Sequence, residues 1–226
     1  NHYNCPIVTS YSENIKNNVE EIAGGEITFR NPFMSFRDLG TVTDALTKEF
    51  TEIPAAEIAA ACEKGWKELA NARHDMEKKG EETLEYLRKT GKRGIVLAGR
   101  PYHVDPEVNH GIDKLIIRQG AAVVTEDSVS CYEEKFDTAV LNQWTYHSRL
   151  YAAAKYCTTQ PDMDLVQLVS FGCGLDAITT DETREILQEG GKLYTQLKID
   201  EITNLGAVNI RLRSLFAALE ERKEDQ

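Results

Sequence analysis

The sequence lacks any apolar run that approaches the roughly 20 residues a membrane-spanning helix requires. It also lacks a charged-then-apolar leader, so we expect a cytoplasmic protein with no membrane partner. The chain begins with Asn rather than Met, and patterned sequence starts at once. We therefore expect a piece of a longer protein.

The chain has fewer basic residues than acidic ones. The chain has 26 Lys and Arg against 37 Asp and Glu, and its formal net charge at pH 7 is −11. A nucleic-acid backbone would repel such a chain at long range, as would an anionic membrane. We therefore expect no nucleic-acid partner, although a local basic pocket is compatible with this charge.

Several nucleotide and hydrolase motifs are missing: no GxxxxGKS or GxxxxGKT, no GxGxxG and no GxSxG occurs. Classical P-loop, dinucleotide and serine-hydrolase sites therefore have no direct support. Asp38-Leu39-Gly40-Thr41 is similar to the phosphate loop of actin-like ATPases, but the second lobe such ATPases need is absent. We interpret this stretch as the start of a helix capped by Thr41 or Thr43, and expect no ATP site in this fragment.

Cysteine is sparse and isolated, with five residues and no CxxC pair. This pattern is poor for a disulfide framework and has the wrong spacing for a zinc ribbon or a zinc finger. Cys62 falls on an apolar helical stripe and Cys157 at a helix end, so both are interpreted as packing residues.

The most suggestive thiol is Cys173, which lies between Gly172 and Gly174 where an apolar strand stops and a helix begins. Glycines leave the backbone open, and free N–H groups at a helix start stabilise a thiolate. Cys5, in Asn-Cys-Pro at another helix start, has a similar setting, and Cys131 follows an acidic loop. The alternative is a buried structural thiol, the usual state of a single cysteine.

The composition, 41% hydrophobic and 28% charged, is that of an ordinary globular core in one large domain or two small ones. We predict a helix-rich N-terminal segment over residues 1–90. It comprises a helix over 6–22, a short strand over 26–29, a break at Asn31-Pro32, and a long helix from Pro54 that Gly80 ends before a second segment over 81–89. The apolar stripe of the long helix either packs within the chain or forms a homodimer.

Residues 91–226 alternate apolar runs with amphipathic segments. We predict strands over 94–99, 121–125, 165–169 and 192–199, and helices over 106–119, 138–156, 180–188 and 204–221. This alternation predicts an α/β fold, a Rossmann-like parallel sheet flanked by helices with right-handed crossovers. Ligands collect beyond the carboxyl ends of such strands, which directs attention to the loops over 100–109, 126–131, 172–176 and 200–206.

The loop after the first strand is rich in polar side chains. Arg100 can hold a carboxylate or phosphate, and His103 or His110 can move a proton or bind a metal. These three residues are the candidates for catalysis. The alternative is a polar loop that satisfies its own backbone and caps the next helix.

Five segments in order carry a family resemblance: Asn-Cys-Pro-Ile-Val-Thr-Ser-Tyr, Ala-Gly-Arg-Pro-Tyr-His-Val-Asp-Pro-Glu-Val-Asn-His-Gly, Gln-Trp-Thr-Tyr-His-Ser-Arg, Ser-Phe-Gly-Cys-Gly-Leu-Asp-Ala and Leu-Lys-Ile-Asp-Glu-Ile-Thr-Asn-Leu-Gly-Ala. The chain resembles the acyl-CoA dehydratase activase-related proteins, which join activase-like ATPase segments to a region related to 2-hydroxyacyl-CoA dehydratase subunits. In the dehydratase relatives, cysteines hold a cubane iron–sulfur cluster that passes single electrons. Cys5 matches the first cysteine motif and Cys173 the last.

The resemblance implies an iron–sulfur module, with a 4Fe–4S cofactor, that passes electrons in an ATP-driven activation system for acyl-CoA-type substrates. It implies as partners the remaining activase and ATPase domains of the parent protein and a dehydratase or an electron donor. A cubane cluster needs about four ligands, and Cys131 is a candidate beside Cys5 and Cys173. The alternatives are a cluster-free docking or structural module and a metal-dependent enzyme that uses His103 and His110.

Overall fold

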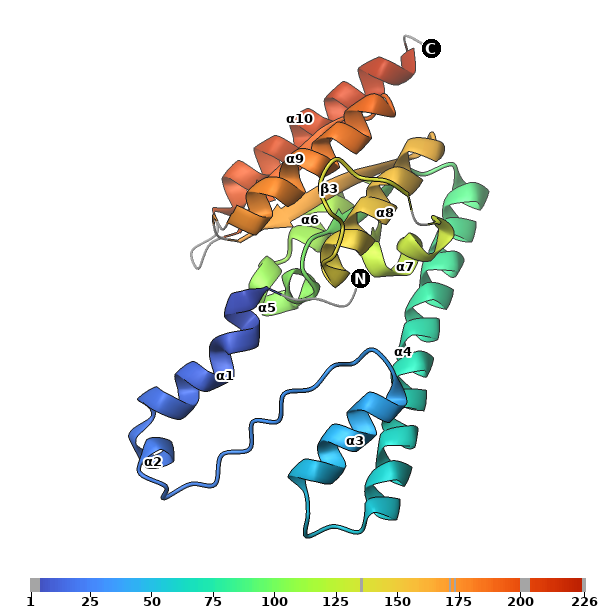
Figure 1. Cartoon of the computed structure of the whole chain (residues 1–226). Coiled ribbons are helices and arrows are strands. Elements are labelled where there is room, and N and C mark those ends of the chain that lie inside the picture. The colour runs from blue at the N-terminus through green and yellow to red at the C-terminus, as the bar shows by residue number, and fades with distance from the viewer. Residues whose placement is uncertain (1–4, 135, 171, 173, 200–203, 225–226) are drawn as a thin grey trace. The chain divides into compact units, whose positions relative to one another are not determined.

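The computed structural model describes residues 5–134, 136–170, 172, 174–199 and 204–224. The chain divides into two compact units (Figure 1). Unit 1 contains Asn1–His74 and Gln143–Thr145, and unit 2 contains Asp75–Asn142 and Tyr146–Gln226. The division falls inside one long helix. Across the described residues, no helix has both the length and the apolar character that crossing a membrane requires.

Unit 1 opens with two helices, α1 (Pro6–Asn18) and α2 (Glu20–Ala23), where the sequence predicted one. The chain is extended at Val19, with φ −94° and ψ 114°. Just before it, the Asn17 and Asn18 amides donate to the carbonyls of Glu13 and Asn14. Such local bonds, together with a β-branched residue that disfavours helix, account for the interruption.

The predicted strand over 26–29 is wrong: these residues form no strand. A strand needs a neighbour for its backbone hydrogen bonds, and the described part of unit 1 offers none. The segment is held by a side chain instead. Arg30 donates to the Glu49 carbonyl at 2.9 Å and to Glu52 at 2.6 Å, and its guanidinium lies 4.4 Å from the Phe50 ring centroid.

Helix α3 (Leu39–Glu49) begins where a cap was expected, but the cap residue differs. Asp38 is the N-cap, and its carboxylate accepts from the Thr41 backbone N–H at 2.8 Å. This bond, aided by Arg37, lowers the pKa of Asp38 to about 2. A carboxylate suits a helix start better than a hydroxyl because it also interacts favourably with the helix dipole.

Helix α4 (Ala55–Thr90) runs unbroken for 36 residues, so the predicted break at Gly80 is wrong. A Cβ at Gly80 would lie 2.6 Å from the Ser128 carbonyl oxygen. The glycine therefore allows the backbone of α4 to lie close to the backbone at Ser128. Its helix penalty of about 1 kcal/mol is too small to end a helix that continues into the core contacts of Leu84 and Leu87.

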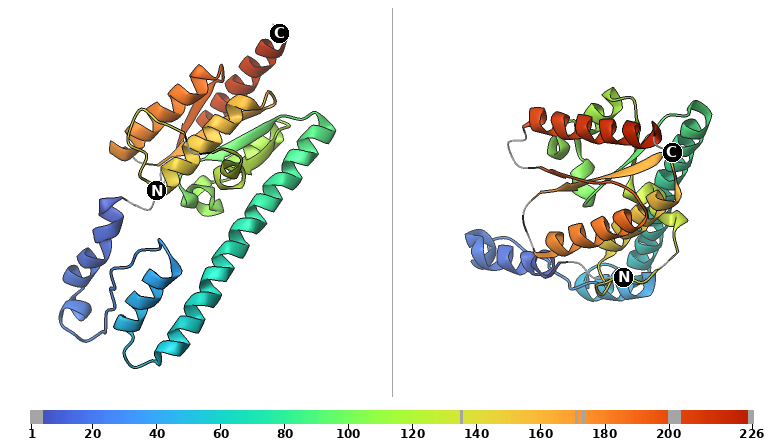
Figure 2. Two further views of the ribbon diagram at one scale, coloured as in Figure 1. Left: turned by 45° about the vertical axis from the view of Figure 1, so that its right-hand side comes forward. Right: turned by 90° about the horizontal axis from the view of Figure 1, so that it is seen from above.

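Unit 2 contains the predicted parallel sheet, confirmed in class and strand number for its described part. The strands are β1 (Gly94–Ala98), β2 (Ala122–Thr125), β3 (Met163–Val169) and β4 (Tyr194–Lys198). Their order is β2-β1-β3-β4, and every pairing is parallel. β1 and β3 are buried throughout because helices cover both faces of the sheet (Figure 2).

The helices of unit 2 start and end differently from the prediction. They are α5 (Pro106–Asn109), α6 (Ile112–Arg118), α7 (Glu126–Val129), α8 (Thr145–Thr159), α9 (Gly174–Glu189) and α10 (Leu205–Glu224), with short 3-10 turns η1 (Pro101–Val104) and η2 (Ser130–Tyr132). The predicted helix over 106–119 divides because His110 and Gly111 have φ 53° and 85°. The helix predicted from residue 138 begins at Thr145 instead.

Two apolar layers sandwich the sheet. On one face, Leu84 of α4, Leu150 of α8 and Leu187 of α9 pack against β1 and β3. On the other face, Ile116 of α6 and Leu212 of α10 pack against the alternate strand residues (Figure 2). This three-layer packing fixes the strand ends relative to one another.

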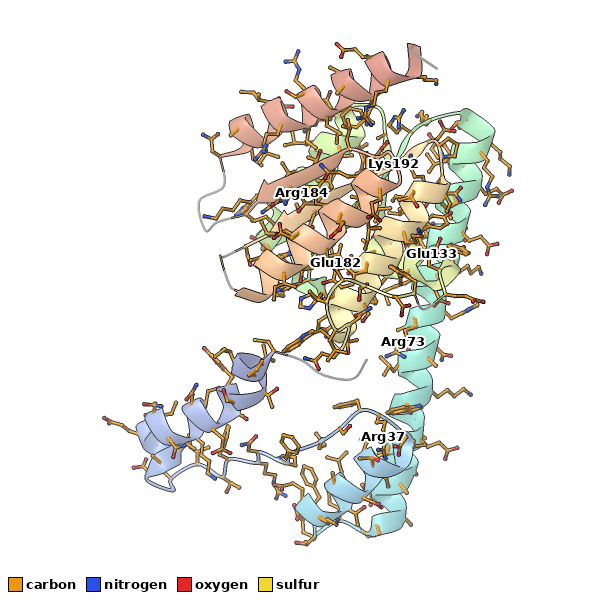
Figure 3. The ribbon with its side chains drawn as sticks, turned by 45° about the horizontal axis from the view of Figure 1, so that its top comes forward. Arg37, Arg73, Glu133, Glu182, Arg184 and Lys192 are labelled. Atoms are coloured by element: carbon orange, nitrogen blue, oxygen red, sulfur yellow. The ribbon has the colours of Figure 1, made fainter. Side chains whose placement is uncertain are left out.

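The amino end of the sheet carries a charge cluster. Asp164, 1% exposed, pairs with Arg93 and lies 3.9 Å from the Lys192 ammonium. Lys192, labelled in Figure 3, also donates to the carbonyls of Gln160 at 2.6 Å, Met163 at 2.8 Å and Pro161 at 3.2 Å. Burial lowers the pKa of Lys192.

Candidate functional site

The site lies at the carboxyl edge of the sheet between β1 and β3. The chain leaves β1 to form β2 on one side, whereas β3 lies on the other side. This is a topological switch point, where the connections diverge and leave a crevice that open α/β sheets use for ligands. The loops that follow β1 and β3 supply its side chains.

Arg100, which follows β1, reaches across to the start of α9. Its Nη2 donates to Asp176 Oδ1 at 2.7 Å, and its Nη1 donates to the Tyr102 hydroxyl at 3.1 Å. The Tyr102 hydroxyl lies 3.3 Å from Ser170 Oγ at the end of β3. Arg100 and Asp176 are 19% and 11% exposed, so this ion pair is partly shielded from water. The two loops are thus joined by one polar chain.

His103 packs against Tyr102, a member of this row of polar contacts, and is 1% exposed. Its Nδ1 accepts from the Arg100 backbone N–H at 3.0 Å. The ring has room because residue 99 is glycine: a Cβ there would lie 2.5 Å from His103 Nδ1. Burial, and then the Arg100 charge, lower the pKa of His103 to about 4. The imidazole is therefore neutral near pH 7.

His147, near the start of α8, belongs to the same group and was not among the predicted site residues. It is 8% exposed, and its pKa is lowered by burial and by the Arg100 charge. The sequence did offer a signal for His147. The helix that leads into β3 starts at the carboxyl edge of the sheet, so a residue in its first turn lies near the site. Asp176 and Tyr102 were also missed as partners of Arg100, and Ser170 was missed as the partner of Tyr102.

A second acid and arginine lie at the end of β2. Glu126 opens α7 and is 2% exposed, and its carboxylate accepts from Arg149 Nη2 at 3.1 Å. Burial raises the pKa of Glu126 to about 7 even though Arg149 opposes the shift. The Arg149 guanidinium also lies 5.1 Å from the Tyr146 ring centroid. The carboxyl edge therefore carries two arginine–carboxylate pairs.

The two predicted histidines lie in different settings. His110 is exposed at the left-handed end of α5, whereas His103 is buried. Asn109 stabilises that turn by donating to the Val104 carbonyl and accepting from the Gly111 N–H. Because His103 Nδ1 already accepts a hydrogen bond, its remaining nitrogen is the one left for chemistry.

The predicted cysteines belong to different parts of the chain. Cys5 lies in unit 1, half-buried, as the N-cap of α1 with Pro6 following at N1, as expected. Cys131 is largely exposed in η2 of unit 2, where partial desolvation and then the Glu77 charge raise the pKa of its thiol. Cys173 lies outside the described residues. A Cβ at either flanking glycine, Gly172 or Gly174, would meet no atom within 4 Å.

An iron–sulfur cluster takes about four ligands, and the positions of the thiols limit how many of these the described residues can supply. Cys157 is fully buried, and burial raises its pKa to about 12. Cys62 lines an apolar cavity. Over the part of the chain that the structure describes, no three His, Cys, Asp or Glu side chains come together to hold a metal ion. These residues do not form a complete cluster site.

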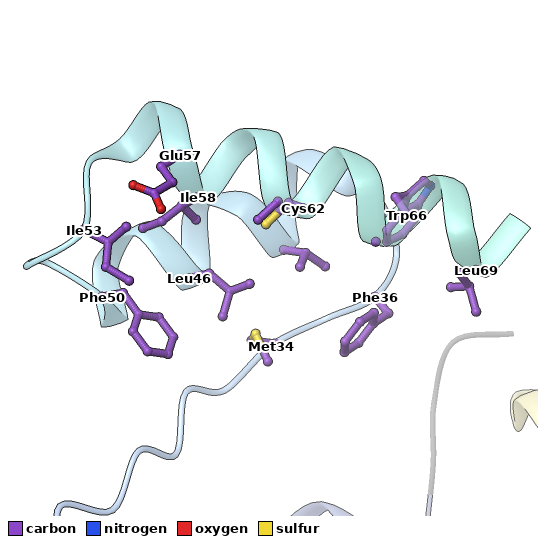
Figure 4. A pocket seen from close by; sticks show the side chains of 13 residues that line it. Met34, Phe36, Leu46, Phe50, Ile53, Glu57, Ile58, Cys62, Trp66 and Leu69 are labelled. Atoms are coloured by element: carbon purple, nitrogen blue, oxygen red, sulfur yellow. The ribbon is translucent and has the colours of Figure 1, made fainter.

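Unit 1 contains that cavity, with a volume of about 610 Å³, between α3, the first turns of α4 and the preceding loop (Figure 4). Trp66 and Leu69 line it from α4, Leu46 and Phe50 from the α3 end, and Phe36 from the loop. The wall is almost wholly apolar, and Phe36 is 66% exposed. Part of the predicted helical stripe is thus the wall of an open groove.

Comparison with known proteins gives one family. A family model described as the CoA enzyme activase uncharacterised domain (DUF2229) matches residues 1–129, more than half of the chain. Comparison with curated proteins and with solved structures gave no match. The matched region includes α1 to α4, then β1, the loop with Arg100 and His103, and β2, and it ends with α7. The chain belongs to the CoA enzyme activase domain family.

Proposed function

We propose that this chain is an iron–sulfur redox module of an ATP-driven activation system that acts on acyl-CoA-type substrates. In this proposal it contributes Cys5 and Cys173 as thiolate ligands to a 4Fe–4S cluster, which would carry single electrons. The ATP-binding lobes and the dehydratase or electron-donor partner are separate from this chain.

The observation that carries the proposal is the setting of the two thiols within a chain of the CoA enzyme activase family. Cys5 caps a 13-residue helix, and backbone N–H groups at such a position stabilise negative charge. Gly172 and Gly174, on either side of Cys173, leave open space where a cofactor can approach. Both features suit thiolates that bind a metal centre.

The described residues do not complete a ligand set, so Cys5 and Cys173 need further ligands. In this proposal these come from Cys131, from another domain of the parent protein, or from a second copy of this chain. We derive no chemical step through the cluster. The role of this chain is to present thiolates and to bind the domains that supply the rest.

Anaerobic reconstitution tests the proposal. We expect the chain to take up iron and sulfide and to give an electron paramagnetic resonance signal on reduction. Cys5→Ser combined with Cys173→Ser should abolish iron binding, whereas Cys62→Ser, a change in the apolar cavity, should preserve it. Absence of iron while a ferredoxin control is loaded, or unchanged iron in the double variant, would contradict the redox role.

A docking role is the second candidate, favoured by the surface of unit 1. Helix α1 has no buried residue, and Ile7, Val8 and Tyr11 are 66%, 59% and 60% exposed. Exposed apolar patches of this kind mark interaction sites. We expect Tyr11→Glu to weaken binding to separately produced activase domains in calorimetry, and Asn14→Glu, at an exposed polar position of the same helix, to leave it unchanged.

A further inference from the structure

The buried imidazole of His103 has a donor without an acceptor. Its Nδ1 accepts from the Arg100 backbone N–H, so Nδ1 carries no proton. The proton of the neutral ring is therefore on Nε2. That atom is buried and makes no hydrogen bond of good geometry to any described residue. The Leu168 backbone carbonyl lies near the ring and only slightly opposes the lowering of its pKa. Buried donors are almost always paired, which makes this one a marker for a ligand atom.

The charges around His103 select the kind of ligand. Arg100 is already neutralised by Asp176 at 2.7 Å, and burial keeps both His103 and His147 neutral near pH 7. The group as a whole has no net charge. An anionic ligand would have to compete with Asp176 for Arg100, whereas a neutral oxygen acceptor leaves that ion pair intact.

The surroundings also offer a route of approach. Tyr102 packs edge-on against the His103 ring, with centroids 4.6 Å apart, and is itself 43% exposed. In this proposal a ligand approaches the imidazole from the side that Tyr102 covers. At the end of β3, the Ser170 hydroxyl lies 3.3 Å from the Tyr102 hydroxyl and supplies a second polar contact.

The geometry points to a binding site for a neutral carbonyl group, of an amide or a thioester, whose oxygen accepts the hydrogen bond of His103 Nε2–H at the switch point between β1 and β3. A neutral imidazole held in one tautomer is a suitable donor to a polarised carbonyl. The inference extends beyond the redox proposal and does not rest on a cluster.

Nuclear magnetic resonance of the ¹⁵N-labelled, iron-free chain tests the site, so failure of the redox proposal leaves this test intact. The probes are acetamide, S-methyl thioacetate and acetate, which separate amide, thioester and carboxylate. We expect a saturable shift of the His103 Nε2 resonance with one or both neutral probes and none with acetate. Equal response to acetate, or no response to either neutral probe, would overturn the inference.

Variants identify the binding atom. His103→Gln retains an N–H donor and should bind the probe, detected through backbone amides of the β1 loop. His103→Phe removes the donor and should weaken binding about tenfold or more. His110→Gln, at an exposed position of the same loop, should bind as the wild type. Unchanged affinity in folded His103→Phe, or loss in His103→Gln with its circular dichroism preserved, would refute the assignment.

Discussion

Both ends of the sheet in unit 2 carry a partly buried arginine–aspartate pair, Arg93–Asp164 at the amino end and Arg100–Asp176 at the carboxyl end. At the amino end a third charge joins, because Lys192 lies near Asp164 and donates to three backbone carbonyls. Every one of these contacts ties one strand or turn to another. The amino end is built for stability.

The carboxyl end has the same pair but a different neighbourhood. Here the pair borders two buried neutral histidines, and His103 Nε2 is left without an acceptor among the described residues. Parallel sheets bind ligands at this end, where the loops meet. The comparison teaches that an ion pair alone says little about function, whereas an unpartnered donor beside it does.

The largest effect is expected at the amino end. Asp164→Ala leaves Arg93 and Lys192, which are 20% and 13% exposed, without their shared counter-charge. We expect it to lower the free energy of unfolding by about 3–5 kcal/mol, measured by urea denaturation followed by far-UV circular dichroism.

Asp176→Ala is the matched change at the carboxyl end. It isolates one cation instead of two, and Arg100 keeps its bond to Tyr102. The loss should therefore be smaller, about 1–3 kcal/mol. An equal or larger loss for Asp176→Ala would remove the distinction between the two ends.

The pH dependence of stability separates two groups at the carboxyl end. The pKa of Glu126 is raised from 4.5 to about 7, so the folded state binds the extra proton and stability falls as pH rises through this range. Glu126→Gln should remove that fall. Relative to wild type, its free energy of unfolding should increase by about 3 kcal/mol between pH 4.5 and pH 7.

His103 titrates in the opposite sense. Its pKa is lowered from 6.5 to about 4, so its contribution is complete above pH 6.5 and is lost as pH falls toward 4. Relative to wild type, His103→Gln should become more stable by about 3 kcal/mol over that fall. If the free energy of unfolding of a variant follows the same pH dependence as that of the wild type, the side chain that was replaced is not shielded from water.

A smaller effect is expected from Gly99→Ala. The added methyl would meet His103 Nδ1 at 2.5 Å and the Leu168 carbonyl at 2.9 Å, so the imidazole must move. We expect a loss of about 1–3 kcal/mol in the free energy of unfolding, together with an altered His103 resonance. Gly172→Ala, which meets nothing within 4 Å, is the control and should change stability by less than about 0.5 kcal/mol.

Much of the sheet could be predicted because its strands are short continuous apolar runs. The run over 94–99 became β1 within one residue, and the run over 165–169 became the end of β3. Their alternation with helices then placed Arg100 and His103 at the ligand-binding edge. Local pattern was sufficient there because burial on both faces leaves a strong sequence signal.

The remainder depended on contacts between distant residues. Asp176 is 76 positions from Arg100, and nothing in the local sequence indicates that pair. Gly80 was predicted to end a helix, and this was wrong because the glycine is there for its close contact with Ser128. That contact is a tertiary feature, which the local sequence does not show. The strand predicted over 26–29 failed for a related reason, since a strand exists only where a neighbour pairs with it.

The protonation state of His103 tests the central claim most directly. Long-range ¹H–¹⁵N spectra distinguish a protonated ring nitrogen from an unprotonated one. At pH 7 the account predicts a neutral ring with its proton on Nε2 and with Nδ1 unprotonated, and a titration near pH 4. A proton on Nδ1, or a titration near pH 6.5, would contradict it.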